Sequence, residues 1–307
     1  MINESNPQII NNTKNIYMIG REKFGVNYGT PYLLNSNKKV LIETGTSLNA
    51  TEILNDLSTL NIEALDYIAV THLHLDHVGG AGFLVEEFPE SKVIVHESGV
   101  EHLINPDRLK KSASRALKKS FEEYGELKPI PRENIKPVSG REEINLGLNQ
   151  SLKIIHTPGH APHHICFYET KTKSLAVGDI AGMYNPNNEK LFPATPPPNF
   201  HLEKTLQSLE KLQELELNSL LYTHYSWTKK PYEKLEEYSK ILRKWVTGIK
   251  KLREELGNDE LVKEKILSGN AERFAPQEAM NEISESEIAM DIRGVLLYLD
   301  SQKKKST

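Results

Sequence analysis

Cysteine is almost absent from this sequence. Among 307 residues there is one, Cys166, so neither an intrachain disulfide framework nor a cysteine-rich zinc module can form. This composition is typical of a reducing compartment, and we expect a cytoplasmic protein. Cys166 itself lies in the apolar run "HHICFYE", where a small core residue is the expected role.

Long apolar runs and an excess of positive charge are also missing. No stretch approaches the roughly 20 apolar residues of a membrane-crossing helix, and the N-terminus lacks the order of a signal peptide. The 38 Lys and Arg and 42 Asp and Glu leave a net charge of −4, which is compatible with a local basic patch at most. We therefore expect a small-molecule substrate, no nucleic acid and no membrane, and leave a homodimer open.

Short apolar runs alternate with helical patterns, which predicts an α/β protein with one large domain and an addition. The following runs are strand candidates: 15–20, 30–36, 38–45, 65–70, 92–97, 151–160, 163–169, 174–179 and 218–226. Helical patterns fall at 47–62, 79–91, 100–121 and 202–215.

Two charged zones differ from this rhythm. Residues 100–137 end in "KPIPRENIKP" and separate two strand candidates, so they predict a helical insertion. Strand signals stop after 228, and an amphipathic pattern with Leu235 and Leu242 on one face begins. The prediction is a main domain at 1–228 and a helical C-terminal appendage at 229–307. Both zones are hypothesised to cover the functional edge of the main domain.

A dense cluster of polar residues follows the apolar run "YIAV". The stretch "THLHLDHVGG" contains His72, His74, Asp76 and His77 within six residues. Such groups are costly to bury unless they are paired or bound. Alternate residues of an extended segment point to one side, so His72 and His74 can share one site while Asp76 and His77 serve a neighbouring one. The alternative, histidines that merely satisfy hydrogen bonds, explains four ligand-type residues poorly.

Three further candidates stand at the ends of other strand-like runs, namely His160, Asp179 and His224. Residues at the ends of adjacent strands can converge on one sheet edge. Five histidines and two aspartates would suffice for two divalent ions bridged by a carboxylate and a water. Nitrogen and carboxylate donors without thiolate favour Zn²⁺, with Fe and Mn as alternatives.

These motifs resemble the metallo-β-lactamase superfamily. "THLHLDHVGG", "HTPGH", "VGD" and "YTHYS" occur in the order that the family shows, and the resemblance covers roughly residues 13–228. It implies a four-layer αββα sandwich with the metals at one edge. It also implies that one metal is held by His72, His74 and His160, that the other is held by Asp76, His77 and His224, and that Asp179 bridges them.

The sequence departs from the family at two places. Glu43 in "LIETG" stands where an aspartate is usual, so the resemblance implies that it orients the metal loop. His163 and His164 stand where small residues are common. One of them is expected to form a local hydrogen bond, and the other is left without a role.

The expected function is metal-dependent hydrolysis of a carboxylic ester, thioester or lactone, similar to the glyoxalase II-like and lactonase-like members. A water shared by two cations would be the nucleophile. Asp76 and Tyr184 are the candidate catalytic side chains, because Tyr184 follows Asp179 closely enough to reach a substrate oxygen.

Two alternatives stay open at this point. The same kind of site serves phosphodiesterases and nucleases, although the acidic balance argues against a nucleic-acid substrate. A di-iron oxygen-binding or redox protein is the other alternative. Flavodiiron-like relatives carry a carboxylate where this chain has His74, and no flavin domain follows.

Overall fold

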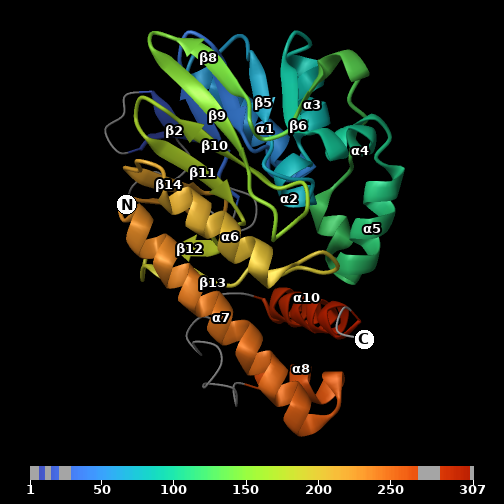
Figure 1. Ribbon diagram of the computed structural model, residues 1–307. Helices are drawn as coiled ribbons and strands as arrows, with labels where there is room; N and C mark the ends of the chain where they lie inside the picture. The colour runs from blue at the N-terminus through green and yellow to red at the C-terminus, as the bar shows by residue number, and fades with distance from the viewer. Residues whose placement is uncertain (1–6, 11–14, 21–28, 269–283, 305–307) are drawn as a thin grey trace.

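Two β-sheets lie face to face between helices in the computed structural model, which describes residues 7–10, 15–20, 29–268 and 284–304 (Figure 1). The first sheet contains, in spatial order, β1 (Gln8–Ile9), β2 (Ile16–Met18), β3 (Tyr32–Asn35), β4 (Lys39–Ile42), β5 (Tyr67–Ala69), β6 (Lys92–His96) and β7 (Ile135–Val138). β1 to β4 pair antiparallel, and β4 to β7 pair parallel. The carboxyl ends of β4, β5 and β6 therefore meet at one edge.

The second sheet has the spatial order β15 (Trp227–Thr228), β14 (Ser219–Tyr222), β11 (Ser174–Gly178), β10 (Ile165–Glu169), β9 (Gln150–His156) and β8 (Glu143–Gly147). β10 pairs antiparallel with both β9 and β11, while β11 and β14 are parallel. The carboxyl ends of β9, β11 and β14 consequently lie at a common edge. A separate hairpin is formed by β12 (Met183–Asn185) and β13 (Lys190–Phe192).

Alternating side chains explain why the sheets pack on both faces. In β4, Leu41 joins an outer cluster with Ile53 of α1 (Ala50–Thr59) and Leu84 of α3 (Ala81–Glu87). Val40, its neighbour in sequence, points the other way, into a cluster shared with Phe167 of the second sheet. The predicted four-layer αββα sandwich is confirmed.

The C-terminal helices are present as predicted, and they share the core of the sandwich. α7 (Pro231–Leu256) and α6 (Leu202–Gln213) cover the outer face of the second sheet (Figure 1). Leu235 and Leu242 lie in one buried cluster with Leu220 and Tyr222 of β14. α8 (Asp259–Leu267) and α10 (Glu285–Lys303) add Ile266 and other side chains to it. The division at residue 228 stays a prediction.

The insertion between β6 and β7 differs from its sequence-based description. The helix expected at 100–121 is broken at Asn105 and Pro106 into α4 (Val100–Ile104) and α5 (Asp107–Leu117), as a proline start requires. The insertion also ends earlier than 137, because β7 already pairs with β6 from Ile135. Pro137 within β7 is tolerated because β7 is an edge strand.

Shorter elements complete the fold. They are the α-helical turn α2 (Leu75–Val78) and the 3₁₀ helices η1 (Ser47–Asn49), η2 (Glu97–Gly99), η3 (Lys118–Tyr124) and η4 (Arg132–Asn134). None of the helices in the described part of the chain has the length and apolarity that a bilayer crossing requires.

Candidate metal centre

The histidine cluster lies in the loop between β5 and α3. His72 and His74 follow the end of β5, and α2 then turns the chain so that Asp76 and His77 project from one helical turn. Gly79 and Gly80 follow. Both glycines lie against the backbone of the loop that follows β4. A Cβ at Gly79 would lie 2.8 Å from the Ser47 nitrogen, and one at Gly80 would lie 2.6 Å from the Thr44 oxygen.

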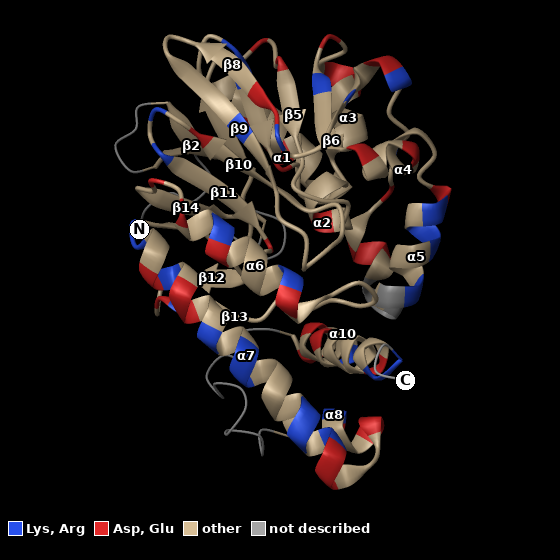
Figure 2. Ribbon diagram, viewed as in Figure 1, with Lys and Arg blue, Asp and Glu red and all other residues tan. Residues whose placement is uncertain are grey.

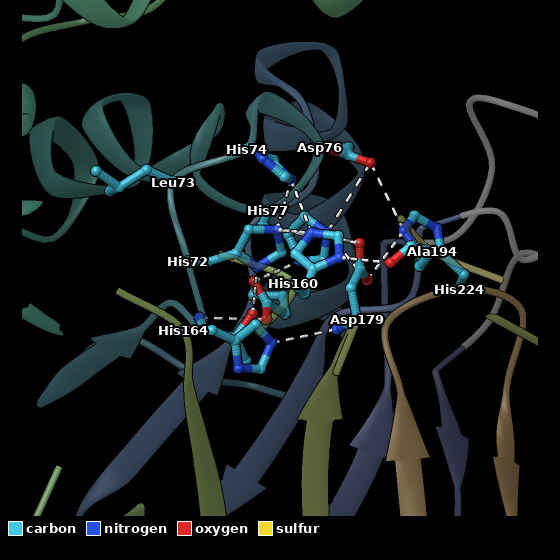
Figure 3. A network of polar contacts seen from close by, with 12 residues as sticks. His72, Leu73, His74, Asp76, His77, His160, His164, Asp179, Ala194 and His224 are labelled. Carbon is cyan, nitrogen blue, oxygen red and sulfur yellow. Dashed lines mark hydrogen bonds and ion pairs between the residues drawn. The ribbon is translucent and has the colours of Figure 1, made fainter. Parts of the chain in front are cut away.

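Three imidazole nitrogens converge at the first group of donors (Figure 3). His72 Nε2 lies 2.8 Å from His74 Nδ1 and 3.1 Å from His160 Nε2, and the last two atoms are 3.0 Å apart. The His160 Nδ1–H donates to the Ala194 carbonyl, which leaves Nε2 with a lone pair in the neutral ring. Because these three nitrogens lie so close together, all three could bind the same cation.

The second group contains Asp76, His77 and His224. Asp76 Oδ2 lies 3.6 Å from His224 Nε2 and 3.9 Å from His77 Nε2. The donor atoms within each of the two groups all lie within 4.8 Å of one another. The structure therefore brings all seven residues singled out in the sequence together, in the two sets that the resemblance implied.

Asp179 stands between the two groups. Its Oδ2 lies 3.5 Å from His160 Nε2, whereas its Oδ1 lies 3.4 Å from His77 Nε2 and 3.3 Å from His224 Nε2. Each carboxylate oxygen thus faces a different group (Figure 3). This arrangement is the one that a bridging ligand needs.

The pKa shifts of the histidines differ between the first and the second group of donors. Burial, followed by the neighbouring imidazoles, holds the pKa of His72 and His74 well below the usual value, so both stay neutral and keep their lone pairs. Burial also opposes charge on His77, but the carboxylates of Asp179, Glu43 and Asp76 outweigh it and raise its pKa. The side of the carboxylates is therefore the more negative one.

Among the buried atoms that lack a hydrogen bond within the described residues, two lie at the centre of the donor groups and test whether a cation fits. They are Asp179 Oδ1 and His77 Nε2, which face each other at 3.4 Å. Unsatisfied buried polar atoms are costly, and a cation between them would satisfy both. The donor set of imidazole nitrogens and carboxylate oxygens, without thiolate, suits a divalent transition metal.

Glu43 lies behind this loop, where the resemblance implied an orienting role. Its side chain is buried, its Oε2 lies 3.3 Å from His77 Nδ1, and its Oε1 accepts a hydrogen bond from the Thr71 N–H. It therefore contacts both the second donor group and the backbone that leads to His72.

Both extra histidines hold backbone next to donor residues, although a local hydrogen bond was expected for only one of them. The Leu73 N–H donates to His163 Nε2 at 3.0 Å. The Asp179 N–H donates to His164 Nε2 at 3.3 Å, and the other nitrogen of His164 pairs with Thr157. Each imidazole therefore acts as an acceptor that fixes the main chain beside the centre.

A cavity of about 550 Å³ opens onto the donors. His74, Asp76, His160, Asp179 and His224 line one part of it. The facing walls are largely apolar and come from the insertion, the loop after β13 and α10. Their apolar side chains are Leu109, Ala113 and Leu117 of the insertion, Pro196, Pro197 and Pro198 of the loop, and Met290 of α10. Both zones that were hypothesised to cover the metal edge thus contribute to its walls.

Tyr184 does not lie where a catalytic residue would. It is buried in β12, its ring stacks on Tyr222 at 5.3 Å, and it belongs to the core cluster under α7. Among the described residues, those that line the cavity do not include it. Although Tyr184 follows Asp179 closely in sequence, the chain turns at Gly182 and enters the core. The catalytic role expected for Tyr184 therefore has no geometric support.

Comparison with known proteins agrees with this geometry. The family model of the metallo-β-lactamase superfamily matches residues 24–224. A metallo-β-lactamase fold-containing protein of Sulfurisphaera tokodaii is 34% identical over 200 residues, covering 64% of this chain and 72% of that protein. A hydroxyacylglutathione hydrolase of Prochlorococcus marinus is 27% identical over 216 residues, covering 70% of this chain and 67% of the relative.

A solved structure extends the likeness over nearly the whole length. The metallo-β-lactamase family protein of Thermus thermophilus superimposes with a TM-score of 0.70, covering 94% of both chains at 18% identity, which shows the fold alone. The matched family model, the order of the motifs and the paired donor groups lead to one conclusion. This chain belongs to the metallo-β-lactamase superfamily.

Proposed function

We propose that the seven donor residues hold two divalent ions and that the protein hydrolyses a carboxylic ester, thioester or lactone. The observation that carries this proposal is the position of Asp179, whose two oxygens face different donor groups. Proteins of this superfamily typically bind metal ions. Zn²⁺ is the preferred metal for the donor set, with Fe and Mn as alternatives.

The residues around the centre have separable tasks. Bound divalent ions would supply a nucleophilic water and a Lewis acid for the substrate oxygen. His72, His74 and His160 stay neutral, so they can act as donors without losing a proton first. Asp76 faces the cavity, and its carboxylate can accept the proton that an attacking water gives up.

The cavity supports an acyl substrate with an apolar group. Apolar walls favour a ligand that buries hydrocarbon against them, while the polar donors at one side align its reactive carbonyl. The relative named hydroxyacylglutathione hydrolase supports a thioester within this class. Substrate choice would then depend on the insertion and α10, since they form the apolar walls.

Phosphodiester hydrolysis is the second candidate, and one observation favours it. Arg108 lines the cavity, and no ion pair or hydrogen bond occupies it among the residues that the structure describes. It lies on α5, which also carries Lys110, Lys111 and Arg115 against a single acidic residue (Figure 2). Of these cations, Arg108 lines the cavity and could contact a phosphate oxygen there.

A comparison of four substrates on one metal-loaded preparation tests the proposal. We expect a higher kcat/KM for a thioester or lactone than for a β-lactam or bis-p-nitrophenyl phosphate. If the phosphodiester is better by about tenfold, or about 1.4 kcal/mol in the transition state, the acyl proposal fails. Arg108→Met serves as the matched variant, because it should weaken phosphodiester turnover while leaving a neutral acyl substrate nearly unaffected.

A further inference from the structure

The segment Ala194–Thr195 connects the donor centre to the C-terminal helices. The Ala194 carbonyl accepts a hydrogen bond of 3.1 Å from His160 Nδ1–H. Because a carbonyl can only accept, this contact fixes which ring nitrogen carries the proton, and His160 Nε2 is left to face His72 and His74. The position of one carbonyl thus determines how His160 is presented.

Helices α7 and α10 hold that segment from two sides. The Ala194 N–H donates to the Tyr238 hydroxyl at 3.2 Å, and the Trp245 indole N–H donates to the Thr195 hydroxyl at 3.2 Å. From α10, Asp291 Oδ1 accepts from the Thr195 N–H at 2.5 Å, and the Asp291 carbonyl accepts from the Thr195 hydroxyl at 3.1 Å. All five residues are buried, although Ala194 and Asp291 also line the cavity, so competition from water for these bonds is limited.

The helix also fits the segment closely. Gly294 lies one turn beyond Asp291, and a Cβ there would overlap the backbone oxygen of Thr195. Burial raises the pKa of Asp291 well above its usual value, and no cation pairs with it in the described part of the chain. A neutral acid accepts the Thr195 N–H as an amide oxygen would, so an asparagine should reproduce the contact.

We propose that Asp291 and Thr195 are positioning residues for the metal centre. α7 and α10 hold the Ala194 carbonyl in place, and this carbonyl fixes the orientation and the tautomer of His160. The inference rests on the proposed role of His160 as a metal donor. The C-terminal helices would then help to build the donor set as well as shape the cavity.

Zn²⁺ binding by two variants of Asp291 tests this proposal. Asp291→Leu keeps the number and branching of the side-chain heavy atoms but removes the acceptor, whereas Asp291→Asn keeps the acceptor. In competition with a chromophoric chelator, we expect the leucine variant to bind Zn²⁺ about tenfold more weakly or worse, which is typical when a partner behind a ligand is lost. The asparagine variant should retain the wild-type affinity.

The metal-free protein gives a second readout. The His160 Nδ1–H signal, observed by NMR on ring-labelled protein, should be present in the wild type and in Asp291→Asn, and should broaden or shift in Asp291→Leu. Should Asp291→Leu not fold, Thr195→Val and Thr195→Ser supply the same comparison. The valine lacks the hydroxyl that contacts both helices, and the serine restores it.

Ile292→Ala is the control for a general loss of stability, because Ile292 is the residue after Asp291 on α10 and its side chain is buried in the core cluster that α10 shares with α7. It should lower Tm without changing Zn²⁺ affinity or the His160 signal. The proposal is overturned if Ile292→Ala weakens Zn²⁺ binding as much as Asp291→Leu, or if Asp291→Leu keeps both readouts. A wild-type protein that binds no Zn²⁺ would instead contradict the proposed function, while the His160 signal would still test the positioning.

Discussion

At the scale of single residues, two neutral histidines accept hydrogen bonds from the backbone beside the centre. Burial, followed by nearby imidazoles, lowers the pKa of His163 to about 4, and burial lowers that of His164 well below its usual value. Both rings accept backbone hydrogen bonds, which a doubly protonated imidazole cannot do. Low basicity therefore preserves the hydrogen bonds that hold Leu73 and Asp179.

Glu142 shows the opposite behaviour and allows a prediction for pH. Slight burial disfavours its charge, but hydrogen bonds from the Ser139 and Arg141 N–H groups and the Ser139 hydroxyl outweigh this and lower its pKa from 4.5 to about 2. A lowered pKa means that the folded state binds this proton less readily than the unfolded chain. Its contribution to stability is complete above 4.5 and is lost as pH falls toward 2.

We therefore expect Glu142→Gln to lower the Tm of the metal-free protein at neutral pH, and the difference from wild type to shrink as pH falls from 4.5 toward 2. Differential scanning calorimetry across this range is the measurement. Glu63→Gln is the matched control, because Glu63 is exposed and should show almost no difference at any pH. A difference for Glu142→Gln that stays constant with pH would contradict the argument.

At the scale of elements, α10 depends on close contact with the loop at Thr195, which follows β13. Alanine is favoured over glycine in a helix by about 1 kcal/mol, yet at Gly294 its Cβ would overlap the Thr195 oxygen. Overpacking of this kind typically costs about 1–3 kcal/mol, so a net loss of stability is expected for Gly294→Ala. Chemical denaturation measures it. Ser301→Ala, at an exposed position of α10, should leave stability nearly unchanged, and an equal result for both variants would count against the contact.

The elements that the sequence predicted are those with a strong local pattern. β5, β9, β11 and β14 each coincide with an apolar run, and the candidate donor residues lie shortly after the ends of these strands. β7 was missed because Pro137 interrupts its pattern, and β8 because only Ile144 and Leu146 alternate with exposed residues. Both strands form because they pair with a neighbouring strand, β6 for β7 and β9 for β8, and their own sequences do not indicate this pairing.

The contact between Asp291 and Thr195 was harder to predict than the position of the candidate donor residues. The donors are recognisable by residue type, since histidines and aspartates after apolar runs are conspicuous. Asp291 and Thr195 are ordinary residues in ordinary contexts, separated by 96 positions. The sequence pattern around Thr195 does not indicate that it contacts Asp291, and the pattern around Asp291 does not indicate it either. The contact becomes apparent only when α10 is packed against the loop at Thr195.

At the scale of the whole molecule, the proposed metal centre would connect the two sheets. Its donors follow β5 in the first sheet and β9, β11 and β14 in the second. Ions that bind only the folded arrangement stabilise it, by about 4 kcal/mol at a free concentration of about 1,000 times Kd. We expect removal of the metal by a chelator to lower Tm accordingly, without loss of the fold.

Two variants test the assignment of the donors. For each of them, the metal content is measured and the Tm is determined by calorimetry. His74→Ala should lose one metal equivalent and part of the stabilisation, and Asp179→Asn should weaken both sites and lose most of it. A colourless, zinc-containing preparation favours hydrolysis, whereas a coloured, iron-containing one favours the redox alternative. Two full equivalents in both variants would contradict the assignment of these donors.

The contact between α10 and the loop at Thr195 also has a consequence for the order of assembly during synthesis. A ribosome must add the 96 residues that separate Thr195 from Asp291 before this contact can form, which takes about 5–20 s at typical elongation rates. All seven candidate donor residues precede Asp291 in the chain, so they are synthesised before α10 can contact the loop at Thr195. If Asp291 positions His160 as proposed, the nascent chain passes through a period in which all the candidate donors are present but His160 is not yet held in its final orientation.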